Sequence, residues 1–312
     1  MVPCGPSSIR DVFSWVPDAI ENVLFNSTLP GRDRLLFALS HGIGASSHYS
    51  GCAGDLAWTG WVRDHLVRTG LIFDADPAFV LIDACDVLPY CRRCLKAFEP
   101  GFKHVFCDMK DRLPSGLKQE VEDLAPKPDG NLDFFEDQFF AVDSVLEAAC
   151  EDPQSSLFLN GSTAYCDLHG KQCMLYGAGH DDVACCVFGF HWAGTSCLDI
   201  TAFGARRGVH GPHSAIWLLW VHERRRRREP VVFTENGPQW PLEETIRALG
   251  DIYEACCIIC CPCLFLSSCV CVIRCLQQIS LIKQSYFRLR SMVCILARVI
   301  VDCGLGASGL WA

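Results

Sequence analysis

Residues 183–197 read VACCVFGFHWAGTSC, and residues 231–237 read VVFTENG. Each stretch opens with a continuous apolar run, and a helical pattern over residues 214–223 lies between the two. Short apolar runs that end in turn residues are typical of strands buried inside a sheet. Two such strands joined by a helix predict a parallel unit in which both strands end at the same edge of the sheet.

The same alternation continues on both sides of this unit. Apolar runs predict further strands at residues 35–39, 78–83 and 104–107. Helical patterns cover residues 56–69, 90–98, 134–149 and 242–254. Strands that alternate with helices predict an α/β fold with a doubly wound, mostly parallel sheet. A chain of 312 residues is long enough to bury a large core in such a domain.

The tail after residue 254 differs in composition. Residues 255–273 read ACCIICCPCLFLSSCVCVI and carry no charge. This length falls within the ~17–25 residues of a membrane span. A buried hairpin or sequence that is not native protein would have the same composition, so the three alternatives stay open. The organisation predicted is a lead-in over 1–34, a domain over 35–254 and a cysteine-rich tail over 255–312.

Charge and cysteine content bear on partners and compartment. The formal net charge is −9, which repels a polyphosphate unless basic residues gather on one face. The dense basic run is residues 224–228. It can be interpreted as a solvated helix end, as a phosphate contact or as a nuclear import signal. Ten of the 22 cysteines lie between Cys256 and Cys303. Without a visible secretory signal, we expect reduced thiols in the cytosol or nucleus.

Three groups of residues follow predicted strands and could bind a nucleoside. A glycine-bearing turn, HYSGCAGD, occupies residues 48–55, and backbone N–H groups at such a turn can approach a ligand. Asp86 and Asp108 follow the next two strands. A carboxylate at a strand end is placed to accept a bond from a ribose hydroxyl or an adenine amine.

Cys197 and Glu235 form the most informative pair. Cys197 follows one predicted strand and Glu235 ends the next, 38 residues later (235 − 197). Consecutive parallel strands open into one crevice, so both side chains are expected to face it. A cysteine there can act as a nucleophile and a carboxylic acid can assist it.

These motifs resemble the cytosine-C5 DNA methyltransferase family over residues 35–254. YSGCAG at 49–54 is similar to the family's Phe-Ser-Gly-x-Gly-Gly, GTSCLDIT at 194–201 to its Gly-Pro-Pro-Cys-Gln-x-Phe-Ser, and Glu235-Asn236-Gly237 to its Glu-Asn-Val. The resemblance implies a Rossmann-like fold that binds S-adenosylmethionine. The implied cofactor-binding residues are Tyr49, Ser50, Gly51, Cys52, Ala53, Gly54, Asp86, Val87 and Asp108.

The resemblance also implies a reaction and a partner. The Cys197 thiolate would add to C6 of a flipped cytosine, Glu235 would stabilise the adduct, and C5 would take the methyl group. Thr201, Arg206 and Arg207 would contact the nucleic acid. Cytosine-containing duplex DNA in the nucleus is the expected partner. RNA is the alternative partner, and the cytoplasm is the alternative compartment. For the function, one alternative is an impaired family member that only binds cofactor or nucleic acid. The other is a membrane-attached cysteine-rich protein.

The sequence departs from the family at three places. Ser196 and Leu198 replace the proline and glutamine that flank the nucleophile. Residues 112–180 are an insertion, and its Cys166, His169, Cys173 and His180 have the residue types of a zinc site at a non-standard spacing, so no metal ligand is assigned. The 58 residues after Glu254 (312 − 254) are too few for a target-recognition domain, which predicts a truncated chain or an aberrant tail.

Overall fold

The structure of this protein is a computed structural model. Its described residues are 21, 29–51, 57–98, 101–159, 162–175, 186, 188–194, 207, 210–236, 242–259 and 269–275. Among these residues the strands form one nine-stranded sheet in the order β5-β4-β3-β2-β1-β6-β7-β9-β8.

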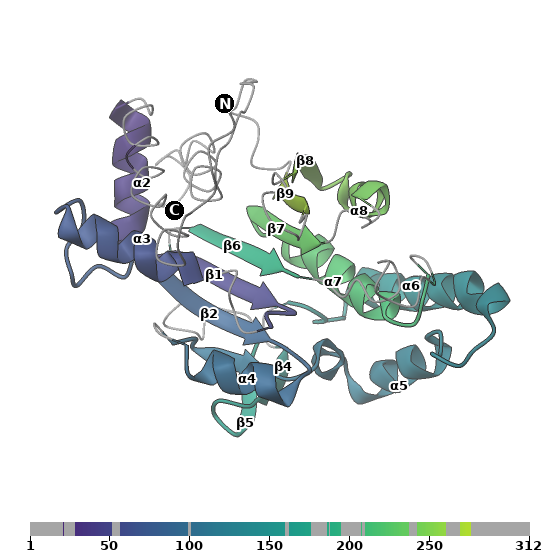
Figure 1. Cartoon of the computed structure of the whole chain (residues 1–312). Coiled ribbons are helices and arrows are strands. Elements are labelled where there is room, and N and C mark those ends of the chain that lie inside the picture. Colours follow the sequence, from purple (N-terminus) through teal and green to yellow (C-terminus); the bar gives the residue numbers. More distant parts are fainter. Residues whose placement is uncertain are drawn as a thin grey trace, which may run out of the picture.

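Five neighbouring strands in the centre of the sheet are parallel (Figure 1). They are β3 (His104–Phe106), β2 (Phe79–Cys85), β1 (Ile43–His48), β6 (Phe188–Ala193) and β7 (Val231–Asn236). The chain moves outward from β1 through β2 to β3, and in the opposite direction from β6 to β7. The order therefore reverses between β1 and β6, and in open α/β sheets ligands bind outside the carboxyl ends of the strands at such a point.

Antiparallel hairpins extend both edges of the parallel core. β4 (Thr163–Cys166) and β5 (Lys171–Met174) lie beside β3, while β9 (Cys269–Cys275) and β8 (Tyr253–Ile259) lie beside β7. Four of the eight strand pairings are consequently antiparallel. The predicted α/β class is confirmed, but the sheet is mixed and not mostly parallel, because each edge ends in a hairpin.

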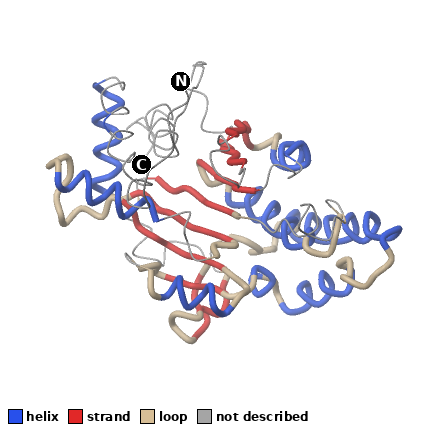
Figure 2. The backbone as a smooth tube through the Cα atoms, in the orientation of Figure 1, coloured by secondary structure: helices blue, strands red, loops and turns tan. Residues whose placement is uncertain are grey.

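Helices cover the sheet (Figure 2). They are α2 (Leu29–His41), α3 (Ala57–Arg68), α4 (Pro89–Lys96), η2 (Met109–Arg112), α5 (Ser115–Leu124), η3 (Leu132–Phe134), α6 (Phe135–Glu151), α7 (Ser214–Arg227) and α8 (Leu242–Leu249). Right-handed crossovers place α3 and α4 on one face and α7 on the other. On α6, Phe135, Phe139, Val142, Leu146 and Cys150 are buried, three or four positions apart, which makes one apolar stripe. Phe139 of this stripe packs on Trp217 of α7.

Two predicted strands are placed differently in the structure. Residues 35–39 belong to α2, where Leu35, Ala38 and Leu39 are buried at helical spacing. The first strand is instead β1, IGASSH, whose small and polar residues are buried because β2 and β6 flank it. The strand predicted at residues 183–188 begins only at Phe188 and ends at Ala193, directly before Gly194.

The start of the cysteine-rich tail belongs to the sheet. α8 ends at Leu249, short of the predicted residue 254, and β8 begins at Tyr253. The expected domain boundary at residue 254 therefore falls inside β8. Of the three alternatives for residues 255–273, the hairpin is the one that β8 and β9 form. Within the described part of the chain, no helix has the length and apolar character needed to cross a bilayer.

Removing the hairpin is expected to make the protein aggregate. A chain that ends at Glu254 lacks β9 and most of β8, and leaves β7 as an unpaired edge with a Val-Val-Phe run. We expect most of this chain in the insoluble fraction, and a chain that ends at Cys275 to elute as the full-length protein does in size-exclusion chromatography. Equal solubility and equal thermal midpoints for both truncations would contradict a structural role for β8 and β9.

Candidate active site

The loops after β1, β2 and β3 meet at one edge of the sheet. The backbone N–H of Ser50, after β1, donates to the carbonyl of Cys85 at the end of β2 over 3.1 Å. The Ser50 hydroxyl donates to the carbonyl of Ser47 over 2.8 Å. The N–H of Asp86 donates in turn to the carbonyl of Phe106 at the end of β3 over 3.4 Å. These bonds hold the start of the glycine turn against the end of β2, and Asp86 against the end of β3.

Asp86 holds the glycine turn through its carboxylate. The carboxylate accepts the backbone N–H of Gly51 over 2.8 Å and that of Leu88 over 2.8 Å. Gly51 has φ 52°, a conformation that favours glycine, and no heavy atom lies within 4 Å of the place where a side chain would begin. Asp86 is itself buried, so these two bonds hold the loop after β1 firmly against the loop after β2.

Asp108 and Val87 complete the ligand-facing groups at this edge. Asp108 caps η2 by accepting the N–H of Lys110 over 2.9 Å, and its side chain is partly exposed. Val87 is 60% exposed directly after Asp86, and the apolar side chains of Leu88 and Tyr90 are exposed close to it in sequence. Val87 thus follows β2 and Asp108 follows β3, and these two strands are parallel neighbours in the sheet.

Tyr49, the first residue after β1, shapes the turn through its side chain and through its backbone conformation. Its hydroxyl donates to the carbonyl of Ile216 on α7 over 2.7 Å, and burial raises the pKa of this hydroxyl well above its usual value. Its φ of 56° is unusual for a residue with a side chain. Backbone strain of this kind is often found at binding sites. The side chain of Tyr49 is thus an anchor between the turn and α7.

The structure places part of the predicted nucleophile and acid pair. Glu235 is in β7, and its backbone pairs with Val270 of β9. Ala193, which ends β6, pairs with Thr234, and the N–H of Gly194 donates to the carbonyl of His48 over 3.2 Å. Gly194 therefore lies beside the end of β1, and Ala193 beside Thr234, the residue before Glu235. Outside the described residues lie the Glu235 side chain, Cys197, Thr201, Arg206, Cys52, Ala53 and Gly54.

Sequence reasoning missed a buried ion cluster behind the site, formed by His48, Asp83, Arg112, Glu223 and Arg224. Glu223 of α7 lies 2.6 Å from the Arg112 guanidinium, 2.9 Å from that of Arg224 and 3.5 Å from His48 Nδ1. The other ring nitrogen of His48 lies 3.3 Å from the Asp83 carboxylate. All five side chains are buried. The cluster ties β1 and β2 to η2 and α7.

The charges of this cluster set its protonation. Burial alone would raise the pKa of Glu223, but the guanidinium groups of Arg112 and Arg224 outweigh burial and lower it to about 2. Burial, assisted by Arg112, lowers the pKa of His48 well below its usual value. Glu223 is therefore ionised and His48 neutral near pH 7.

His191 on β6 is neutral for a reason that the geometry shows directly. Trp220 Nε1 lies 3.0 Å from His191 Nε2, and an indole N–H can only donate, so Nε2 accepts. The remaining nitrogen, Nδ1, carries the proton and donates to the Ser46 hydroxyl over 2.8 Å. In agreement with this, burial and then Arg224 lower the pKa of His191 well below its usual value.

The arginine run at 224–228 serves the interior of the protein. Arg224 is fully buried in the ion cluster and also pairs with Glu229 over 2.8 Å. Arg225 makes a bidentate pair with Asp251, at 2.6 and 2.7 Å. Arg226 donates to the carbonyls of Cys150 and Ser155. The run does end a helix, as one alternative had it, but four of its members bind groups of the protein: Arg224, Arg225, Arg226 and Arg227.

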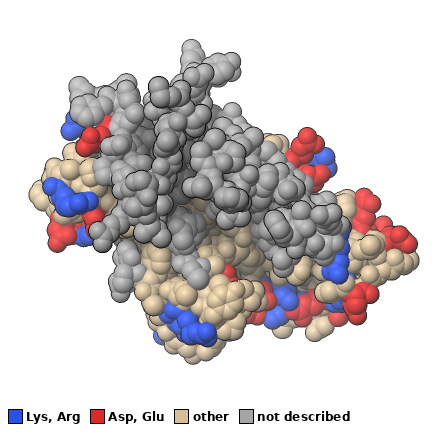
Figure 3. Space-filling model, in the orientation of Figure 1, with Lys and Arg blue, Asp and Glu red and all other residues tan. Residues whose placement is uncertain are grey.

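The described surface has no large basic patch on the face shown in Figure 3, where Lys and Arg alternate with Asp and Glu. Arg207, a predicted nucleic-acid contact, is half-buried. A nucleic acid would therefore need contacts from loops as well as from the charges visible there.

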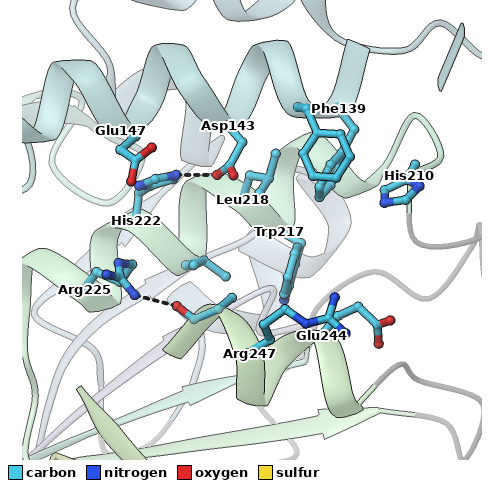
Figure 4. A pocket seen from close by; sticks show the side chains of 13 residues that line it. Phe139, Asp143, Glu147, His210, Trp217, Leu218, His222, Arg225, Glu244 and Arg247 are labelled. Atoms are coloured by element: carbon cyan, nitrogen blue, oxygen red, sulfur yellow. Dashed lines mark hydrogen bonds and ion pairs between the residues drawn. The ribbon is translucent and has the colours of Figure 1, made fainter. Parts of the chain in front are cut away.

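A second hollow lies among α6, α7 and α8, away from the strand ends (Figure 4). Its volume is about 320 Å³, and Phe139, Trp217 and His210 make one wall. His222 Nε2 lies 2.8 Å from the Asp143 carboxylate across it. This pair joins α7 to α6, so the hollow lies at the junction of these helices.

Comparisons with known proteins give loose structural similarity alone. No protein-family model matches the sequence, and no curated protein matches it significantly. The crystal structure of the S. pombe Dnmt2 methyltransferase is similar with a TM-score of 0.38 at 13% identity, over 78% of this chain and 52% of that one. A putative DNA modification methyltransferase encoded within an E. coli prophage gives a TM-score of 0.36 at 12% identity, over 78% of this chain and 49% of that one. This chain therefore spans about half the length of either.

Proposed function

We propose that this protein is an S-adenosylmethionine-dependent methyltransferase whose cofactor lies at the carboxyl ends of β1, β2 and β3. The observation that carries the proposal is the Asp86 carboxylate, which accepts the N–H of Gly51 and so holds the left-handed glycine turn against the end of β2. The cofactor supplies an electrophilic methyl group when it is bound. Asp86 would accept the ribose hydroxyls, Asp108 the adenine amine, and Val87 would cover the purine ring.

The proposed target is C5 of cytosine. This carbon is a poor nucleophile until a thiolate adds to C6. The Cys197 thiolate would form the S–C6 bond, and Glu235 would donate a proton or a hydrogen bond to ring N3. The electron density gained at C5 would then form the new C5–CH₃ bond, while the S–CH₃ bond of S-adenosylmethionine breaks and S-adenosylhomocysteine leaves with that electron pair. A base removes the C5 proton, the S–C6 bond breaks, and the thiolate is regenerated. The 38-residue separation of Cys197 and Glu235, and the adjacency of β6 and β7, support this assignment.

The proposed substrate is a cytosine flipped out of duplex DNA. The protein would then act in the nucleus. The test offers labelled S-adenosylmethionine to a cytosine-rich DNA duplex, to the same duplex with 5-methylcytosine at every cytosine, and to transfer RNA. We expect label in the unmodified duplex only. Label in the RNA alone would move the activity to RNA, whereas cofactor binding with no label in any substrate would overturn the proposed reaction.

Asp86→Asn is expected to weaken cofactor binding roughly 10- to 100-fold, since a hydrogen bond to a charged group contributes about 1.5–3 kcal/mol. The amide keeps one acceptor oxygen but turns an NH₂ group toward the N–H of Gly51 or Leu88. Calorimetric titration with S-adenosylmethionine measures the change. Asp74→Asn is the matched control, because Asp74 is exposed and pairs with Arg63. An equal loss of affinity in both variants would remove Asp86 from the site.

A further inference from the structure

We propose that the protein binds one zinc ion between His104, Cys166, His169 and Cys173, at the junction of β3 with the β4–β5 hairpin. One ligand atom from each residue, two imidazole nitrogens and two thiol sulfurs, lies within 4.8 Å of all the others. This cluster is separate from the proposed cofactor site, and its assignment does not depend on methyl transfer.

The strand register explains why these residues converge. Phe106 of β3 pairs with Cys166 of β4, so Cys166 faces the same side of the sheet as His104, two residues before Phe106. Ala164 pairs with Cys173 of β5, which puts Cys173 on that side as well. Three ligands from three adjacent strands therefore share one face.

The hairpin turn supplies the fourth ligand. Residues 167–170 reverse the chain, with Gly170 at φ 64° and its N–H bound to the carbonyl of Cys166 over 2.8 Å. This tight turn brings His169 back over the two cysteines. His169 Nδ1 lies 3.4 Å from Cys166 Sγ and 3.4 Å from Cys173 Sγ.

These distances match tetrahedral zinc. Zn–S bonds of about 2.3 Å and Zn–N bonds of about 2.0–2.1 Å place a sulfur and a nitrogen ligand about 3.6 Å apart. The two observed Sγ–Nδ1 separations are within a few tenths of an ångström of that value. The His104 and His169 rings are 4.9 Å apart and inclined by 67°, so they approach the centre from different directions.

The donor set selects the metal and its role. Two thiolates and two imidazoles favour zinc over the oxygen-seeking calcium and magnesium. Four protein ligands fill a tetrahedron and leave no position for water, which is typical of a structural site. His104, Cys166 and Cys173 are buried, whereas His169 is exposed and gives the ion a path inward. Both cysteines are free thiols.

Such an ion would fasten a weak part of the sheet. β4 and β5 have four residues each, and a short hairpin is marginally stable by itself. The ion would join this hairpin to β3, which leads directly to Asp108. The sequence pattern offers His180 as the fourth ligand. His180 lies outside the described residues, and among those described the fourth ligand is His104, 62 residues before Cys166 (166 − 104).

The experiment measures metal content of the full chain, purified without a metal-affinity step, by mass spectrometry. We expect about one zinc per chain in the wild type, and less than a tenth of that in His169→Ala and Cys173→Ser. His169 is exposed, so its variant is expected to stay folded. His180→Ala and Cys94→Ser are the matched controls, and both are expected to keep the zinc.

Cobalt substitution reports the ligands directly. Co²⁺ in the wild type should give the intense visible bands of tetrahedral thiolate coordination, and His104→Ala should change them while His180→Ala does not. Zinc retained in both His169→Ala and Cys173→Ser would overturn the site. Loss of zinc in His180→Ala with retention in His104→Ala would overturn the ligand assignment. A Cys166–Cys173 disulfide in the metal-free wild type would replace the site with a redox pair.

Discussion

Cys197→Ala is expected to lower methyl transfer to cytosine by at least about 1,000-fold, since loss of a catalytic nucleophile removes the covalent route. The proposed reaction depends on electron density that only addition to C6 sends to C5. Affinity for S-adenosylmethionine should change little, because the cofactor would lie at β1, β2 and β3, while Cys197 follows β6. Single-turnover transfer of labelled methyl groups, beside calorimetric titration of the cofactor, separates the two effects.

Glu235→Gln tests the partner acid in the same assay. Glutamine keeps the shape but cannot donate a proton to ring N3, and loss of general acid–base assistance costs about 100- to 10,000-fold. Cys94→Ala is the matched control for Cys197→Ala, because Cys94 is exposed and lies far before Cys197 in the sequence.

A trapped adduct distinguishes a nucleophile from a residue that only supports the fold. DNA with fluorine at C5 of the target cytosine lacks the proton whose loss releases the enzyme, so the S–C6 bond should persist. We expect a denaturation-resistant complex with the wild type and with Cys94→Ala, and none with Cys197→Ala. A complex of equal yield with Cys197→Ala would assign the nucleophile to another cysteine.

The fold was predictable where burial and periodicity agree. The helices at α3, α4 and α6 and the strands β2 and β7 follow from apolar patterns close to their observed bounds. β1 could not be predicted from its sequence, because IGASSH is buried by the strands on either side of it and has no apolar pattern of its own. The apolar run beside it, at residues 35–39, is explained equally well by a strand or by one face of α2. The antiparallel edges were also missed, since hydrophobic pattern does not encode strand direction.

For the candidate sites, local motifs were predictable and long-range partners were not. Asp86 and Asp108 follow predicted strands, so a parallel sheet brings their loops to one edge. The described start of the glycine turn, Tyr49 to Gly51, follows β1, which the sequence pattern did not predict. His104 joins Cys166 only through the pairing of β3 with β4, which the sequence pattern does not specify. Arg224 reads as part of a solvated basic run, yet Glu223 and Glu229 neutralise it in the interior.

Glu223→Gln is expected to destabilise the protein by about 3–5 kcal/mol, the largest stability effect that we expect from a single substitution here. The change leaves the guanidinium groups of Arg112 and Arg224 buried with one neutral partner in place of a carboxylate. The cost is the desolvation of those charges, which the remaining contacts no longer offset. Chemical denaturation at pH 7 measures it.

Asp251→Asn provides the matched control. Asp251 pairs with Arg225 on the same helix, but 58% of its side chain is exposed, and exposed pairs contribute about 0–1 kcal/mol. An equal loss of unfolding free energy in both variants would show that the buried ion cluster contributes no more to stability than the exposed pair.

The wild type is expected to lose stability in two acid steps. His48 and His191 have pKa values well below 6.5 in the folded chain, because burial penalises their charged forms. Below about pH 6.5 the unfolded chain therefore binds protons at both rings that the folded chain refuses. The folding equilibrium constant should fall by up to about tenfold per pH unit for each histidine. Glu223 adds a second loss as the pH falls from its unfolded pKa of 4.5 toward its folded pKa of about 2.

Variants assign each step to its residue. His48→Asn should be less stable than the wild type at pH 8, and the difference should shrink below pH 6.5, where the slope of the variant is smaller by about one proton. Glu223→Gln should lack the loss of stability that the Glu223 carboxyl causes below pH 4.5, since glutamine does not titrate. Its lost carboxylate also ceases to favour the protonated form of His48, so the slope near pH 6 should not decrease. Urea titrations from pH 8 to about pH 2.5 measure these slopes, and a flat profile for the wild type between pH 6.5 and pH 5 would contradict neutral buried histidines.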